Sequence, residues 1–162
     1  MKLTIKTANA MQKLGASIAV VCELGCVIYL HGELGAGKTT LVRGFLHKLG
    51  HSGHVRSPTF TLVEPYQFDD VSVCHFDLYR LVDPEEFTYI GGRDYFTKQS
   101  ICLIEWPERG KGFLPAADLI CDFDFAAKGK WREVKLIAGS DKGKTIVGEL
   151  GSRSASFTAS LR

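Results

Sequence analysis

The segment CVIYLHGELGAGKTT, at residues 26–40, limits the fold more than any other part of the chain. It opens with a short apolar run typical of a buried strand, passes through a glycine-rich loop and continues into a helical pattern. Gly32, Gly37, Lys38 and Thr39 fit the spacing Gly-x-x-x-x-Gly-Lys-Thr. Between a strand and a helix, this spacing is typical of a loop whose backbone N–H groups surround phosphate oxygens. We therefore expect an α/β fold with a nucleoside triphosphate site.

Each residue type in this loop has a physical role. The glycines let the backbone turn tightly, and the helix that follows presents its positive N-terminal dipole to the anion. Lys38 is expected to reach the β- and γ-phosphates, and the hydroxyl of Thr39 to bind Mg²⁺. The nucleotide-binding residues predicted in this way are Glu33, Leu34, Gly35, Ala36, Gly37, Lys38, Thr39 and Thr40.

The remaining sequence alternates between helical and extended patterns. Helices are expected at 8–22 and 39–50, and the sequence Asp-Pro-Glu-Glu at 83–86 marks another helix start. Strands are expected at 26–31, 59–66, 71–79, 101–105, 118–125 and 131–138. We predict a three-layer P-loop NTPase fold in which helices flank a mixed, mostly parallel sheet. It forms a single domain over residues 1–138, followed by a weakly ordered tail at 139–162 that is rich in small and polar residues.

Composition narrows the class of protein only a little. The chain has 162 residues, is 45% hydrophobic and carries a formal net charge of +2, a balance that neither requires nor excludes nucleic acid. Its five cysteines do not form a zinc-binding tetrad, which favours reduced thiols. The sequence shows no signal peptide and no apolar run of membrane-spanning length, so we expect a soluble cytoplasmic protein without a membrane partner.

Two acidic residues end predicted strands and are candidates for holding Mg²⁺. Asp77 ends VSVCHFD, whose polar and apolar residues alternate, while Glu105 ends the continuously apolar ICLIE. The carboxyl ends of both strands can open on one ligand crevice. Either acid can also serve as a structural ion-pair partner, and the pattern alone does not choose between them.

Three hydroxyl residues follow the predicted nucleotide-binding helix in the segment VRSPTFT. Ser57 is held extended by the proline after it, and Thr59 and Thr61 come next. A threonine on a loop in this position can sense the γ-phosphate, as switch loops do. The same residues also suit an ordinary strand entry. In the strand that follows, His75 lies in an apolar setting and is expected to be a core histidine with its polar atoms satisfied.

The class of nucleotide can be narrowed from what the sequence lacks. The only asparagine, Asn9, precedes the loop, so no Asn-Lys-x-Asp motif for guanine is present and ATP is favoured over GTP. A small-molecule or nucleoside kinase is the alternative, since Arg80, Arg93 and Arg109 offer positive charge for a second substrate. No arginine finger is identifiable, and P-loop ATPases of that kind tend to be slow until a partner completes the site.

Five motifs, in order, resemble the TsaE family, formerly called YjeE, of bacterial P-loop ATPases. They are GELGAGKTT, SPTFTLVEPY, HFDLYRL, GRDYF and IEWPERG. The resemblance implies a role in making threonylcarbamoyladenosine in tRNA. It also implies TsaB and TsaD as protein partners, contact with tRNA only through that complex, and ATP hydrolysis with Mg²⁺ to support repeated turnover. Gly92, where an apolar residue is commoner in the family, is a departure.

Carried over by motif, the resemblance assigns roles to both acids. Asp77 matches the Walker B acid and Glu105 a second acid near Mg²⁺ and the attacking water, so Lys38, Asp77 and Glu105 are the expected catalytic residues and Thr39, Asp77 and Glu105 the expected metal ligands. Ser57, Thr59 and Thr61 fall on the switch-like loop, and Arg80 and Trp106 are candidates to face a partner. Thr7 and Arg132 are expected adenine contacts.

Three hypotheses of function follow from these residues. The first is a partner-stimulated ATPase, the second a kinase that transfers phosphate to an acceptor, and the third a nucleotide-switched binding module with negligible turnover. The hydrolysis rate, the oligomeric state and any contact between the basic C-terminal tail and tRNA stay open.

Overall fold

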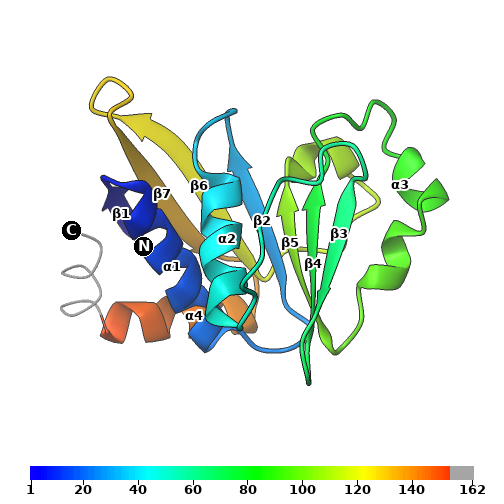
Figure 1. Ribbon diagram of the computed structural model, residues 1–162, viewed down its shortest axis with the longest axis horizontal. Coiled ribbons are helices and arrows are strands. Elements are labelled where there is room, and N and C mark those ends of the chain that lie inside the picture. The colour runs from blue at the N-terminus through cyan, green and yellow to red at the C-terminus, as the bar shows by residue number, and fades with distance from the viewer. Residues whose placement is uncertain (154–162) are drawn as a thin grey trace.

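A computed structural model describes residues 1–153. Its seven strands form one sheet in the order β1-β7-β6-β2-β5-β4-β3 (Figure 1). The four central strands, β6, β2, β5 and β4, are parallel to one another, and the outer pairs are antiparallel. The strands are β1 (Lys2–Ile5), β2 (Val27–Gly32), β3 (Val63–Gln67), β4 (Ser72–Asp77), β5 (Ser100–Glu105), β6 (Leu119–Ala126) and β7 (Trp131–Ala138). The predicted α/β class with a mixed sheet is confirmed.

Helices and loops cover the two faces of this sheet. The helices are α1 (Ala8–Val21), α2 (Lys38–Lys48), α3 (Glu86–Tyr89) and α4 (Asp141–Ser152), and two 3₁₀ turns are η1 (Gly92–Tyr95) and η2 (Pro107–Gly110). One hydrophobic core lies between the sheet and the helices α1, α2 and α4, which cover one face of the sheet. A second core lies on the opposite face of β4 and β5, where the segments 78–96 and 106–114 cover the strands. There Phe76 of β4 packs against Phe87 of α3. Among the described residues, no helix is long and apolar enough to cross a membrane.

The nucleotide-binding loop connects β2 to α2, as its pattern predicts. Val27, Ile28 and Leu30 are buried between the two cores, so β2 is a central strand. The helix starts at Lys38 directly after Gly37, whose φ of 108° is accessible to glycine at little cost. At the other end, Gly50 has a φ of 104° and terminates the helix where the sequence indicates.

The expectation of a weakly ordered tail at 139–162 is wrong for residues 141–152. Residues Asp141–Ser152 form α4, with Ser140 as the N-cap and with Ile146 and Leu150 buried against the first core. The segment is rich in small and polar residues, which is why a weakly ordered tail was expected. Its apolar residues Ile146 and Leu150 are nevertheless spaced i, i+4, and this pair is enough to dock a short amphipathic helix onto a sheet. The last part of that predicted tail, 154–162, lies outside the described residues.

Two strands also differ from the prediction. The strand expected at 59–66 begins only at Val63, because residues 59–62 form a turn in which Leu62 has a φ of 65°. The edge strand β1 was not predicted, although Lys2–Ile5 alternates exposed and buried positions as a half-buried strand does. The predicted helix start is present, since Glu86 accepts a bond from the Asp83 amide at 3.0 Å.

Candidate functional site

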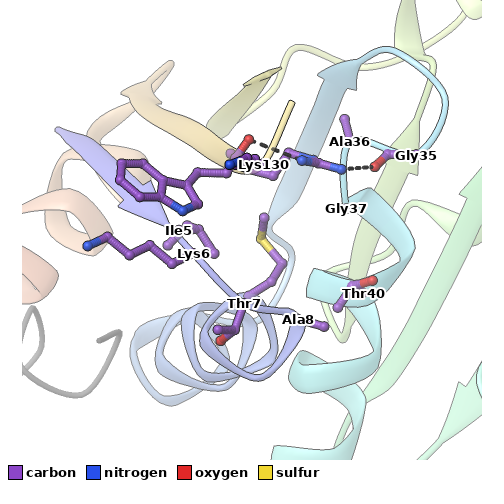
Figure 2. A pocket seen from close by; sticks show the side chains of 12 residues that line it. Ile5, Lys6, Thr7, Ala8, Gly35, Ala36, Gly37, Thr40 and Lys130 are labelled. Atoms are coloured by element: carbon purple, nitrogen blue, oxygen red, sulfur yellow. Dashed lines mark hydrogen bonds between the residues drawn. The ribbon is translucent and has the colours of Figure 1, made fainter. Parts of the chain in front are cut away.

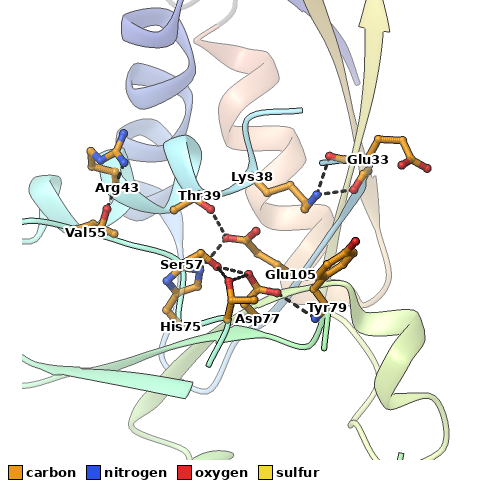
Figure 3. Close-up of polar contacts among 12 residues, drawn as sticks. Glu33, Lys38, Thr39, Arg43, Val55, Ser57, His75, Asp77, Tyr79 and Glu105 are labelled. Carbon is orange, nitrogen blue, oxygen red and sulfur yellow. Dashed lines mark hydrogen bonds and ion pairs between the residues drawn. The ribbon is translucent and has the colours of Figure 1, made fainter. Parts of the chain in front are cut away.

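Lys38 lies buried at the base of the glycine-rich loop. Its Nζ donates to the carbonyl oxygens of Gly32 and Glu33, the second at 2.9 Å (Figure 3). The same Nζ lies 4.3 Å from the ring centroid of Trp106. Burial lowers the pKa of this ammonium below its usual value, and the carboxylates of Glu105 and Asp77 oppose the shift. The loop therefore holds a cation ready for an anionic ligand, because phosphate oxygens would replace carbonyl oxygens as its partners.

At the start of the loop, position 32 requires glycine for close packing as well as for the turn. Gly32 has a φ of 148° and is paired with Phe123 of β6. A Cβ at Gly32 would lie 2.7 Å from the Phe123 carbonyl oxygen, closer than carbon and oxygen can approach without movement of the backbone. Gly32 therefore allows both the turn of the loop and the close approach of β2 to β6.

The two predicted acids converge on this loop from neighbouring strands. Asp77 and Glu105 are opposite each other at the carboxyl ends of β4 and β5, and both side chains are buried. Glu105 Oε1 accepts a hydrogen bond from Thr39 Oγ1 at 2.8 Å (Figure 3). Sequence patterns left the choice between the acids open, and the sheet register brings both to the same end of the sheet as the start of α2.

Asp77 is bound by the predicted switch loop. Ser57 Oγ and Thr59 Oγ1 both donate to Asp77 Oδ2, the second at 3.1 Å, and the Tyr79 amide donates to Oδ1 at 3.0 Å. The third hydroxyl of the loop, Thr61, is exposed and lies in the turn before β3, away from this cluster. The structure therefore brings two of the three predicted hydroxyl residues to the acid.

These groups surround a cavity of about 250 Å³. Its donor atoms suit Mg²⁺, which prefers oxygen ligands from one or two carboxylates together with phosphate oxygens. Thr39, Asp77 and Glu105 supply such oxygens, and Thr39 and Glu105 already lie at hydrogen-bonding distance. The cavity is lined by Leu34, Gly35, Ala36, Gly37, Lys38, Thr39, Thr40, Ser57, Thr59, Asp77, Glu105 and Trp106.

A second cavity, of about 200 Å³, adjoins the other side of the loop (Figure 2). Both expected adenine contacts line it. Arg132 Nη2 donates to the Gly35 carbonyl at 3.1 Å, and Thr7 is the N-cap of α1, where its Oγ1 accepts from the Ala10 amide at 3.0 Å. The sequence did not predict the other lining residues, because they come from two segments that lie more than 100 residues apart in the chain. They are Ile5, Lys6, Ala8, Met11, Lys130 and Trp131.

The two residues predicted to face a partner are differently placed. Trp106 is half-buried directly after Glu105, with a φ of 58° and its ring 5.0 Å from that of Tyr79. Arg80 is exposed, and its guanidinium lies 4.2 Å from the ring of Phe60, which is 82% exposed. This stacked pair leaves both side chains accessible at the surface next to the switch loop.

His75 lies in the core as the sequence predicts, but the sequence did not indicate its partner. It is fully buried on β4, and its Nε2 lies 2.8 Å from Glu105 Oε1. Its Nδ1 has no hydrogen-bond partner among the described residues, so the expectation of a fully satisfied core histidine is wrong. The signal that could have found this contact is spacing, because His75 precedes Asp77 by two residues and so shares its face of the sheet.

Comparisons with known proteins agree on one family. The family model for "Threonylcarbamoyl adenosine biosynthesis protein TsaE" matches residues 5–134. The TsaE protein of Haemophilus influenzae is 52% identical over 125 residues, 77% of this chain and 78% of the relative. That of Aquifex aeolicus is 37% identical over 137 residues, 83% and 94% of the two chains. The crystal structure of YdiB from Bacillus subtilis matches with a TM-score of 0.81 at 27% identity and covers 95% of each chain. This chain therefore belongs to the TsaE family.

Proposed function

We propose that this protein is a Mg²⁺-dependent ATPase that works in the cytoplasm with TsaB and TsaD. Its family gives it a role in tRNA threonylcarbamoyladenosine biosynthesis. The observation that carries the ATPase proposal is the register of β4 and β5, which sets Asp77 and Glu105 side by side facing Lys38 and Thr39. P-loop hydrolases combine a phosphate-binding loop with an acid that holds Mg²⁺ and a residue that orients water, and the two buried carboxylates can fill the last two roles.

The phosphates of ATP would bind at the loop between β2 and α2. Backbone N–H groups of residues 33–40 and the N-terminus of α2 attract the anion, and Lys38 neutralises its charge. The cavity excludes bulk water from the buried side chains that line it, so each charge interacts more strongly than it would in solution.

Thr39, Asp77 and Glu105 would hold Mg²⁺ at this cavity. When bound, the ion neutralises charge on the phosphate oxygens and helps to orient them. The chain's own contribution would be to place these three side chains in the lining of one cavity. Glu105 also has the position to orient the attacking water and to accept its proton, because its carboxylate opens on the cavity.

The adenosine part would occupy the second cavity. It adjoins Gly35, Ala36 and Gly37, so a nucleotide with its phosphates in the loop extends into it. Thr7 and Arg132 line its rim, and the exposed indole of Trp131 offers a surface on which a base can stack.

The site favours activation by a partner. The described residues that line the phosphate cavity include no arginine that could act as a finger on the γ-phosphate. Trp106 and the switch residues Ser57 and Thr59 line this cavity, and Arg80 stacks on the exposed ring of Phe60 in the same loop. A partner that binds this surface can add the missing charge and change the contacts of Asp77 at the same time.

Phosphate release from Mg-ATP tests this function, measured for the protein alone and with TsaB, TsaD and tRNA. We expect slow release alone and strong stimulation by the partners. Fast release by the protein alone would remove the partner-gated mechanism. Phosphate appearing on a small acceptor would instead identify a kinase. A lack of turnover under all conditions, together with ATP-dependent partner binding, would identify a nucleotide-switched binding module.

A further inference from the structure

The contact between His75 and Glu105 is unusual for a residue in the interior of a sheet. His75 is one of few buried polar residues, and its neighbours on the same face of β4 are Val73 and Asp77. Its partner in register on β5 is Leu103, and Glu105 lies two residues further along that strand. The imidazole therefore reaches diagonally between the strands to the carboxylate (Figure 3).

The hydrogen bond has a defined direction. An ionised carboxylate only accepts hydrogen bonds, so His75 Nε2 carries the proton and donates to Glu105 Oε1. In this tautomer Nδ1 is a bare acceptor, which agrees with its lack of any donor within residues 1–153. A buried acceptor without a donor costs free energy, so an apolar residue of similar size would pack at position 75 more favourably.

Glu105 Oε1 accepts from two sides at once. Thr39 Oγ1 and His75 Nε2 each lie 2.8 Å from it. No described residue donates to the other oxygen, Oε2. Two donors on one oxygen fix the rotation of the carboxylate about its terminal bond, which is otherwise a broad torsion. Oε2 is then left available for a ligand of the cavity.

We propose that His75 is a positioning residue that fixes the orientation of the Glu105 carboxylate between the start of α2 and the phosphate cavity. The proposal rests on the proposed function, in which Glu105 contacts Mg²⁺ and the attacking water. His75 touches neither, and it acts through Glu105. If the Thr39 hydroxyl bound Mg²⁺ in place of the carboxylate, the hydrogen bond from His75 would still hold Glu105.

Three substitutions separate this role from packing. His75→Leu fills the same space without a donor, and His75→Gln keeps an amide N–H at the Nε2 position. His75→Asn places its amide one bond short, at the Nδ1 position, and cannot reach Glu105. The matched control is Val73→Ala. Val73 is buried on the same face of β4 but does not line the phosphate cavity, so its truncation lowers stability only through lost packing.

Two measurements are made on the full-length chain. The first is the affinity for a fluorescent ATP analogue, measured once with Mg²⁺ and once with EDTA. The affinity with Mg²⁺ divided by the affinity with EDTA is called the Mg²⁺ ratio. The second is kcat and KM for ATP hydrolysis with TsaB, TsaD and tRNA present. Thermal unfolding of each variant shows whether it is folded.

We expect His75→Leu and His75→Asn to reduce the Mg²⁺ ratio and kcat about 10- to 100-fold, the usual effect of losing a residue that orients a ligand-binding side chain. Affinity in EDTA and the unfolding temperature of His75→Leu stay at or above the wild-type values. His75→Gln recovers most of both losses, and Val73→Ala lowers the unfolding temperature without changing the Mg²⁺ ratio.

The inference is overturned if His75→Leu keeps the wild-type Mg²⁺ ratio and kcat, because His75 would then only fill space. It is also overturned if folded His75→Gln is as impaired as His75→Asn, since a donor at Nε2 would not be the property that matters. Failure of the proposed function looks different. In that case the wild-type chain itself shows no ATP hydrolysis with its partners, while the Mg²⁺ ratio still compares the variants.

Discussion

The two buried acids of the site have different partners and therefore different roles. Asp77 accepts hydrogen bonds from Ser57 and Thr59 of the loop before β3, so its position depends on that loop. Glu105 accepts from Thr39 at the start of α2 and from His75 within the sheet, which are rigid elements. Under the proposed function, a change in the loop would act on Asp77 first, while Glu105 would keep a fixed orientation toward the cavity.

A pair of substitutions distinguishes binding from hydrolysis at this scale. We expect Glu105→Gln to keep ATP affinity in EDTA within a fewfold and to lower partner-stimulated hydrolysis by about 10²- to 10⁴-fold, the usual contribution of a group that moves a proton. Lys38→Ala should lose both, because the phosphates lose their buried cation. ATP binding by calorimetry and phosphate release measure the two effects.

The control for this pair is Glu85→Gln, which removes an exposed acid at the start of α3. It should leave binding and hydrolysis unchanged. A Glu105→Gln protein that hydrolyses ATP at the wild-type rate would exclude Glu105 from the chemistry.

Single residues differ in how far the sequence predicts them. Lys38 and Thr39 belong to a local pattern with a known mechanism, so their place in the site follows from spacing. The contacts of Asp77 and Glu105 depend on the register of β4 against β5, which no local pattern specifies. His75 was missed for the same reason, since its partner is 30 residues away along the chain.

At the scale of elements, α1 holds the nucleotide-binding helix close to the sheet. The two helices approach so closely that glycine is needed at their contact. A Cβ at Gly15 would lie 2.0 Å from the Leu41 carbonyl oxygen, and one at Gly44 would lie 2.0 Å from that of Gln12. Backbone against backbone leaves no flexible side chain to move, so any larger residue has to separate the helices.

Substitution of these glycines by alanine should therefore destabilise the protein. We expect Gly15→Ala and Gly44→Ala each to lower the free energy of unfolding by roughly 1–3 kcal/mol or more. Urea unfolding followed by circular dichroism measures this change. The control is Gly148→Ala on α4, where nothing lies within 4 Å of the added Cβ. That substitution should stabilise by about 0.5–1 kcal/mol, because alanine favours a helix. Equal stability of all three variants would contradict the close approach of α1 and α2.

The C-terminal helix allows a second test at this scale. Leu150 on α4 is 1% exposed, so Leu150→Ala should cost about 2–5 kcal/mol of unfolding free energy. Val82, which is 88% exposed, supplies the control, and Val82→Ala should change stability by no more than about 0.5 kcal/mol. A small effect of Leu150→Ala would instead support the weakly ordered tail that the composition predicts. Thermal and urea unfolding both report the difference.

Elements were predicted well where a strong local signal marks them. The end of α2 at Gly50 and the bond from the Asp83 amide to Glu86 follow from residues whose conformational preferences are large. Edge strand β1 and helix α4 have weaker signals, because each becomes stable only by docking onto the sheet. Their existence depends on tertiary contacts, which composition and periodicity do not reveal.

For the molecule as a whole, the sheet order explains how distant segments form one site. Strand β2 lies at the centre, with β5, β4 and β3 on one side and β6, β7 and β1 on the other (Figure 1). The phosphate cavity is lined by residues at the ends of β4 and β5, and the second cavity by residues of β7 and the start of α1. An extended nucleotide would therefore cross the loop after β2, from one half of the sheet to the other.

This arrangement predicts that the two ends of ATP can be weakened separately. Trp131 lines the second cavity, is 39% exposed and has Lys6 Nζ 4.6 Å from its ring centroid. We expect Trp131→Ala to weaken ATP binding about 5- to 150-fold, the effect of losing one stacked base. Affinity for tripolyphosphate, which has no base, should stay unchanged. Calorimetry with both ligands makes the comparison, and equal weakening of the two would place the base outside this cavity.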